Sequence, residues 1–136
     1  MNAWQILIAI LKVVAENIRV LHRNLEGGEW FPVHEKLGEY YAMIDDITDD
    51  LVEIGLGQGI PEITIQEAIK IYKPITADPR NAKTSLTLVK GYFTDIATLM
   101  LEIADDIEEE YISDKLRTYI EQLIKEAEYK LARAIK

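Results

Sequence analysis

Residues 30–59, WFPVHEKLGEYYAMIDDITDDLVEIGLGQG, place an apolar side chain at every third or fourth position over most of their length. This spacing gathers the apolar side chains on one face of an α-helix, because a helix has 3.6 residues per turn. Pro32 suits the first turn of such a helix, and three closely spaced glycines at the end of the stretch would stop it. The stretch therefore predicts a long helix that buries one face in a helical core.

Capping signals at the start of the chain predict a helix that precedes this one. Asn2 and Gln5 have the spacing of a capping box, in which each side chain accepts a hydrogen bond from the other residue's backbone N–H. The helix is therefore expected to begin at once and to run to about Leu25. Gly27 and Gly28 follow, and their tolerance of positive φ suits the turn that leads into the next helix.

The segment that follows residue 59 predicts a long connection with a short helix of its own. Thr64 and Glu67 repeat the capping-box spacing ahead of this helix, which is expected to run to about Tyr72 and to be closed by Pro74. A connection of this length lets the next long helix run parallel to the preceding one rather than fold straight back.

Two further long helices are expected in the second half of the chain. The first spans roughly residues 80–110, and the second spans roughly residues 114–135 with Ser113 as its N-cap. The last helix has apolar residues at spacings of three and four, as bundle helices do. We therefore predict an all-α chain, a ferritin-like four-helix bundle with a short extra helix in the crossover, folded as a single domain over residues 1–136.

The composition argues against several functions. The 136 residues include no cysteine, which excludes disulfides, thiolate metal sites and thiol catalysis. The formal net charge of −9 argues against nucleic acid and anionic membrane as partners, because such binding needs clustered Lys and Arg. The apolar start has no basic leader and is interrupted by Gln5 and Lys12, so we expect neither a signal peptide nor a membrane span. A cytoplasmic protein without direct DNA binding is the expectation.

The two histidines of the chain are the strongest candidates for metal ligands. His22 and His34 each lie about one helical turn from the turn that joins the first two helices, so they lie at similar height and can share a site. Asp49 and Glu53 fall in the same arc of the second helix as His34. However, Asp49 lies about 22 Å further along the helix axis than His34. One chain therefore cannot close a site that uses all of these residues.

Two copies of the chain can close such a site. If two of the second helices cross antiparallel about a two-fold axis near Tyr41 and Ala42, His34 of one copy falls beside Asp49 and Glu53 of the other. These ligands suit iron, and zinc fits the same set. The simpler interpretation is a solvated acidic helix face, which is what most acidic runs are.

Several short motifs of the first two helices share one family pattern: Leu21-His22-Arg23-Asn24, Gly27-Gly28, Phe31, Val33-His34-Glu35 and Asp49-x-x-x-Glu53. Together they resemble the signature of the Dps proteins, the ferritin-like miniferritins of starved bacterial cells. The resemblance implies a hollow dodecamer of two-fold dimers that oxidises ferrous iron with hydrogen peroxide or oxygen, stores ferric mineral and protects against oxidative stress. The catalytic ferroxidase centre that it implies takes histidines from one subunit and carboxylates from its mate: His22, His34, Asp49 and Glu53.

The chain departs from the family pattern at two positions. Gly38 stands where the family usually has an aspartate ligand, and Arg23 replaces a tryptophan beside the first histidine. Arg23 puts a fixed positive charge next to the expected cation site. Glu39 or Asp45 can supply the missing carboxylate. The departures keep a second interpretation open, in which the assembly has lost its chemistry and serves as a scaffold or binding module.

A second acidic cluster, residues 105–110, lies near the end of the third long helix. The helix dipole disfavours negative charge at that end. Together with Asp114, the cluster can line a three-fold pore that draws cations inward, as pores of the family do near this junction. A solvated helix end explains the same residues, and both interpretations stay open.

Overall fold

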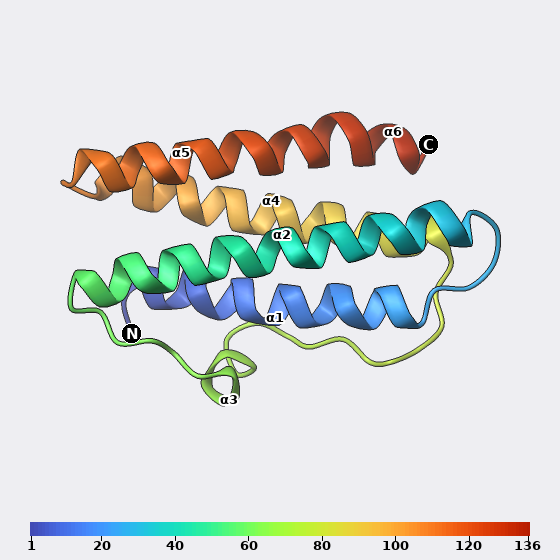
Figure 1. Cartoon of the computed structure of the whole chain (residues 1–136), viewed down its shortest axis with the longest axis horizontal. Helices are drawn as coiled ribbons and strands as arrows, with labels where there is room; N and C mark the ends of the chain where they lie inside the picture. Colours follow the sequence, from blue (N-terminus) through green and yellow to red (C-terminus); the bar gives the residue numbers. More distant parts are fainter. The chain divides into compact units, whose positions relative to one another are not determined.

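The computed structural model describes all residues from Met1 to Lys136 and contains helices but no strand (Figure 1). The predicted all-α class is confirmed. The chain forms two compact units, Met1–Ser85 and Leu86–Lys136. The expectation of one domain over residues 1–136 stays a prediction. None of the helices has the length and apolar content needed to cross a bilayer.

The first unit is built on two long antiparallel helices, α1 (Ala3–Arg23) and α2 (Trp30–Gly57), which a short turn joins (Figure 1). The predicted capping box at the start of α1 is present, with both of its reciprocal hydrogen bonds. In the turn, Gly27 takes φ +92° as expected. The second left-handed residue is Glu29, with φ 68°, rather than Gly28.

The C-terminal part of α2 packs closely against the start of α1. The helix continues through Gly55, which was expected to help end it, and ends at Gly57, while Gly59 takes φ +79° in the turn beyond. A Cβ atom at Gly55 would lie only 2.6 Å from Nε1 of Trp4. Trp4 is buried and donates from Nε1 to the Leu51 carbonyl at 3.1 Å. Gly55 is thus needed for the close approach of an indole rather than for a helix stop.

The crossover after α2 contains the predicted short helix, α3 (Ile65–Ala68), which packs beside α1. Thr64 and Glu67 form the predicted capping box at its start. The short helix ends before Tyr72, the expected end, and turns follow it.

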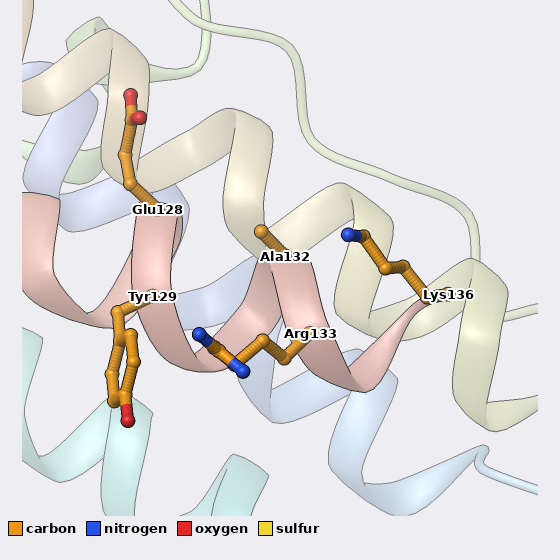
Figure 2. Close-up of a pocket in the computed structure, with 5 residues that line it drawn as sticks. All are labelled: Glu128, Tyr129, Ala132, Arg133 and Lys136. Atoms are coloured by element: carbon orange, nitrogen blue, oxygen red, sulfur yellow. The ribbon is translucent and has the colours of Figure 1, made fainter.

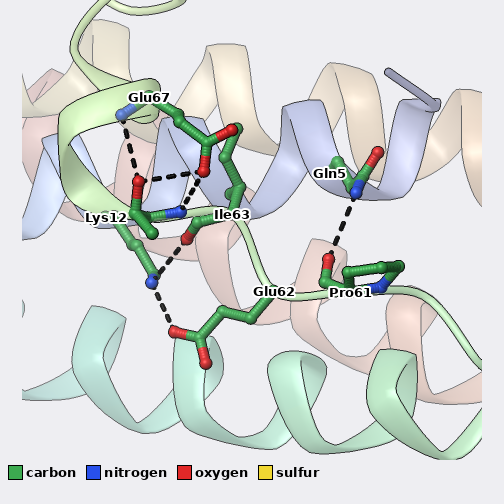
Figure 3. Close-up of polar contacts among 7 residues, drawn as sticks. Gln5, Lys12, Pro61, Glu62, Ile63 and Glu67 are labelled. Atoms are coloured by element: carbon green, nitrogen blue, oxygen red, sulfur yellow. Dashed lines mark hydrogen bonds and ion pairs between the residues drawn. The ribbon is translucent and has the colours of Figure 1, made fainter.

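Two polar side chains of α1 hold the crossover, as Figure 3 shows. Gln5 donates from its amide nitrogen to the Pro61 carbonyl at 3.2 Å. Lys12 donates from Nζ to the Glu62 carboxylate at 2.5 Å and to the Ile63 carbonyl at 2.7 Å. The crossover is therefore bonded to α1 at Glu62 and at the residues on both sides of it.

The second unit contains most of α4 (Ala82–Asp106) and the last helix, which begins as α5 (Glu110–Ile124). The prediction that Ser113 caps the last helix is wrong, because Glu109 occupies the N-cap position. The Ser113 hydroxyl instead donates to the Ala104 carbonyl at 2.9 Å, so it ties the turn between the helices to the end of α4.

The last helix continues through a π-helical segment, η1 (Lys125–Leu131), into α6 (Ala132–Ala134). The expected buried face of this helix is present, since Leu116, Leu123 and Leu131 are buried. Side chains around the π-helical segment line an open depression (Figure 2): Glu128, Tyr129, Ala132, Arg133 and Lys136. The Arg133 guanidinium lies 4.7 Å from the centre of the Tyr129 ring, so its cation faces an aromatic surface.

Candidate metal site

His22 and His34 lie together where α1 ends and α2 begins. Their rings stack with centroids 3.7 Å apart and planes 18° from parallel. The structure thus brings together the two side chains that the sequence analysis placed at one height. Neither ring is fully exposed, so both belong to the packed part of this end of the unit.

Each imidazole forms a hydrogen bond to the backbone of the residue that carries the other imidazole. Nδ1 of His22 lies 2.7 Å from the His34 carbonyl oxygen, and Nδ1 of His34 lies 2.9 Å from the His22 carbonyl oxygen. A carbonyl oxygen only accepts, so both Nδ1 atoms carry a hydrogen and donate it. In the neutral rings, both Nε2 atoms therefore keep a free lone pair, which is the state that binds metal.

The electrostatics of this end favour the neutral, metal-binding form of His22. Burial lowers the pKa of His22 below its ordinary value, and positive charge on His34 and Arg23 lowers it further. The hydrogen bond to the His34 carbonyl raises the pKa of His22, but its effect is smaller than that of burial. His22 thus stays neutral to a lower pH than an ordinary histidine does.

Aromatic side chains enclose the pair on its outer faces. Trp30 stacks on His34, with ring centroids 4.2 Å apart and planes 12° from parallel. Tyr41 meets His22 edge to face at 5.5 Å, and the Arg19 guanidinium lies 4.7 Å from the centre of the Tyr41 ring. Trp30 was not among the predicted site residues. The one sign of it in the sequence is an aromatic residue four positions before His34, a spacing that brings two side chains together on a helix.

Gly38 explains how the His22 ring fits against α2. A Cβ atom at this position would lie 3.3 Å from Cε1 of His22, closer than most real contacts allow. The departure from the family pattern therefore has a physical counterpart, because the space next to Gly38 is occupied by the imidazole. A carboxylate at this position would require the His22 ring to shift by a few tenths of an ångström.

The two carboxylates considered as substitutes for the missing one have cationic neighbours within the subunit. Glu39 lies 3.5 Å from the ammonium of Lys36. Asp45 forms an ion pair with Arg19. Neither carboxylate forms a metal-holding group with the two histidines in this subunit, and the role of either as a replacement ligand stays a prediction.

The predicted carboxylate ligands lie apart from the histidines. Asp49 and Glu53 are exposed, one helical turn from each other on α2, and they line an open depression together with Lys12 and Glu62. No group of three or more histidine and acidic side chains is close enough to hold a metal ion. The subunit therefore presents an imidazole pair and a carboxylate pair in separate places, and their joint action stays a prediction.

The acidic cluster of the second unit is also exposed. Its first residue, Asp105, forms an ion pair of 2.7 Å with Arg117. Surface ion pairs of this kind contribute little to stability. The pore interpretation of residues 105–110 stays a prediction.

The arrangement of long helices with a helix-bearing crossover defines the ferritin-like class of helical proteins. No protein-family model and no curated protein matches the chain by sequence. Solved structures match its fold over nearly the whole chain. A Dps protein from Vibrio cholerae, described as a member of a broad superfamily of ferritin-like diiron-carboxylate proteins, is 24% identical with a TM-score of 0.91, covering 99% of this chain and 87% of that chain.

Two further solved structures have the same fold. The antigen TpF1 from Treponema pallidum is 21% identical with a TM-score of 0.91, covering 98% of this chain and 89% of that chain. Dps from Staphylococcus aureus is 19% identical with a TM-score of 0.88, covering 98% of this chain and 93% of that chain. At these identities the likeness is one of fold. The predicted ferritin-like fold and the resemblance to Dps proteins are confirmed at that level.

Proposed function

We propose that this chain is a divergent Dps-like subunit that oxidises ferrous iron at sites shared between two copies and stores the ferric product inside a hollow dodecamer. The observation that carries the proposal is the stacked His22–His34 pair, with both Nδ1 atoms bonded to backbone and both Nε2 atoms free to bind. The fold shared with Dps proteins supports the same function.

The stacking geometry favours two metal ions over one. A metal ion lies in the plane of the imidazole that binds it, about 2 Å from the nitrogen. Two planes that are 18° from parallel, in rings 3.7 Å apart, do not meet within that distance. His22 and His34 therefore cannot share an ion and serve separate ones.

A pair of ferrous ions matches the electron demand of hydrogen peroxide. Peroxide takes up two electrons and two protons to give two water molecules, and each ferrous ion supplies one of the electrons as it becomes ferric. With both ions in one site, the oxygen–oxygen bond breaks without release of a one-electron product such as hydroxyl radical. This chemistry would protect the cell as well as store iron, and zinc would compete for the same ligands.

The missing oxygen ligands would come from a second copy of the chain. Asp49 and Glu53 are exposed and free of bulky cover, and carboxylate oxygens suit ferric iron. Ala42 lies between His34 and Asp49 on α2, is exposed and has a small side chain, so two such helices can approach closely there. An antiparallel pair of α2 helices would then form two equivalent sites from four half-sites.

A complementation experiment tests the shared site directly. A His22→Ala/His34→Ala variant and an Asp49→Ala/Glu53→Ala variant are each expected to lose peroxide-dependent ferrous oxidation. When the two are unfolded together and reassembled, a mixed dimer has one fully mutated site and one intact site. Random mixing should therefore restore about a quarter of wild-type activity per subunit. The unmixed variants, reassembled in the same way, are the controls.

No restoration in mixed assemblies of normal size would reject the shared site. A second function, a scaffold or binding module without the chemistry, is favoured by Gly38, whose place beside His22 leaves no room for a carboxylate without a shift of the ring. It predicts full-size assemblies in which the wild-type chain oxidises iron no faster than the Asp49→Ala/Glu53→Ala variant.

A further inference from the structure

We infer that Trp30 is a positioning residue of the metal site, which holds the ring of His34 in the orientation that presents Nε2 to a metal ion. The inference rests on the function proposed above. It begins from the fact that both faces of the His34 ring are covered, by Trp30 at 4.2 Å and by His22 at 3.7 Å. Only the edge of the His34 ring is left open.

Trp30 is itself held in place, which lets it act as a fixed wall. Its Nε1 donates to the Leu25 carbonyl at 2.8 Å, in the turn that follows α1. The ring of Phe31 meets the indole edge to face at 5.1 Å on another side. Since Trp30 is the first residue of α2, the indole spans from the start of one helix to the backbone that ends the other. The position of the Trp30 indole is therefore fixed by contacts other than those with the histidines.

Because both faces of the His34 ring are covered, the ring cannot turn over and move Nε2 away from a metal ion. A histidine ring that turns over about its Cβ–Cγ bond exchanges the positions of its nitrogen and carbon edges. In His34 such a turn would drive the ring edge into Trp30 or into His22. It would also break the hydrogen bond from Nδ1 to the His22 carbonyl. Trp30 thereby preserves the tautomer in which Nε2 binds, as outer-shell groups do at known metal sites.

The test compares three variants by imidazole ¹⁵N NMR of the metal-free protein, which distinguishes the two neutral tautomers of each histidine. In the wild type we expect both histidines in the Nδ1–H form. Trp30→Ala should turn His34 into a mixture of tautomers, and Trp30→Phe, which keeps a ring but lacks the indole N–H, should show a smaller change. Trp4→Phe is the matched control for the tautomers, because it also loses an indole bond to a backbone carbonyl but lies away from both histidines.

Metal affinity supplies the second measurement, with Co²⁺ as the probe. We expect Trp30→Ala to bind Co²⁺ about tenfold more weakly than the wild type does, at the lower end of the effects seen for outer-shell groups. An unchanged His34 tautomer in Trp30→Ala, or an equal change in Trp4→Phe, would overturn the inference. If the wild type oxidises no iron, the proposed function fails, and the tautomer measurement still decides the role of Trp30.

Discussion

The two ends of α2 differ in how much of their structure the subunit provides by itself. At the N-terminal end, His34 is stacked between Trp30 and His22 and bonded to backbone. Further along the helix, Asp49 and Glu53 are exposed in an open depression. The difference follows the chemistry of the ligands. An imidazole binds a metal through one nitrogen and in one direction, so its ring must be oriented. A carboxylate binds through either oxygen, so its orientation matters less.

Under the proposed function, the subunit orders the imidazole ligands by itself, and the exposed carboxylate ligands meet the metal only when two copies assemble. If so, substitutions at the two ends should have similar effects on iron oxidation and different effects on the stability of the folded subunit.

The largest expected effect is the loss of activity at either end. His34→Ala and Asp49→Ala should each reduce peroxide-dependent ferrous oxidation by about a hundredfold or more, since each removes a ligand. Only His34→Ala should destabilise the subunit, by about 1–3 kcal/mol, because it removes a stacked ring and leaves the His22 carbonyl without its donor. Asp49→Ala should stay within about 0.5 kcal/mol of the wild type.

Urea unfolding and stopped-flow oxidation of the same two variants provide the measurements. An Asp49→Ala variant that loses as much stability as His34→Ala would show that the carboxylate end is also built within the subunit. The proposed difference between the two ends of α2 would then be wrong.

A smaller effect is expected at Gly38, which lies against the His22 ring. Gly38→Ala should weaken Co²⁺ binding by up to about tenfold, because the new Cβ pushes the His22 ring. Gly38→Asp adds the same Cβ together with a carboxylate, so it should bind Co²⁺ more tightly than Gly38→Ala. Titration of both variants checks this, and equal affinities would show that a carboxylate here cannot reach the ion.

The smallest effect is a pH dependence of stability confined to the histidine end. Because the folded subunit lowers the pKa of His22, the unfolded chain binds the proton more readily. The contribution to stability is fully present above the ordinary histidine pKa of about 6.5 and declines as the pH falls below it, until the lower pKa of the folded state is passed.

Urea unfolding at a series of pH values measures this effect. His22→Gln should flatten the decline below about pH 6.5, whereas Asp49→Ala should leave it unchanged. A decline of equal slope in wild type and His22→Gln would assign the pH dependence to other groups.

Much of the fold could be predicted because it depends on local signals. The capping boxes at Asn2 and Thr64 need only residues three positions apart, and both are present. The assignment of Ser113 as a cap failed because its hydroxyl has a second acceptor, the Ala104 carbonyl, which a local pattern does not contain. Gly55 was misread for the same reason, since the indole that fills its missing side chain comes from the other helix.

The candidate site, too, could be predicted only where it depends on local signals. Helical rise alone places His22 and His34 at one height, and the structure brings their rings together. Their tautomers and the role of Trp30 depend on how three side chains pack across two helices, which periodicity does not determine. The proposed pairing of the histidines with Asp49 and Glu53 would need a second copy, so one subunit cannot show it.

The reciprocal bonds between the histidines and each other's backbone have a consequence for how such a site can be lost or gained. Removal of either ring uncovers one face of its neighbour and leaves one carbonyl without its imidazole donor, while the neighbour keeps its own bond to the backbone. A single substitution at either histidine therefore removes one ligand and part of the support of the other. Gain of the centre is favoured when both rings are present, because each ring then covers one face of the other.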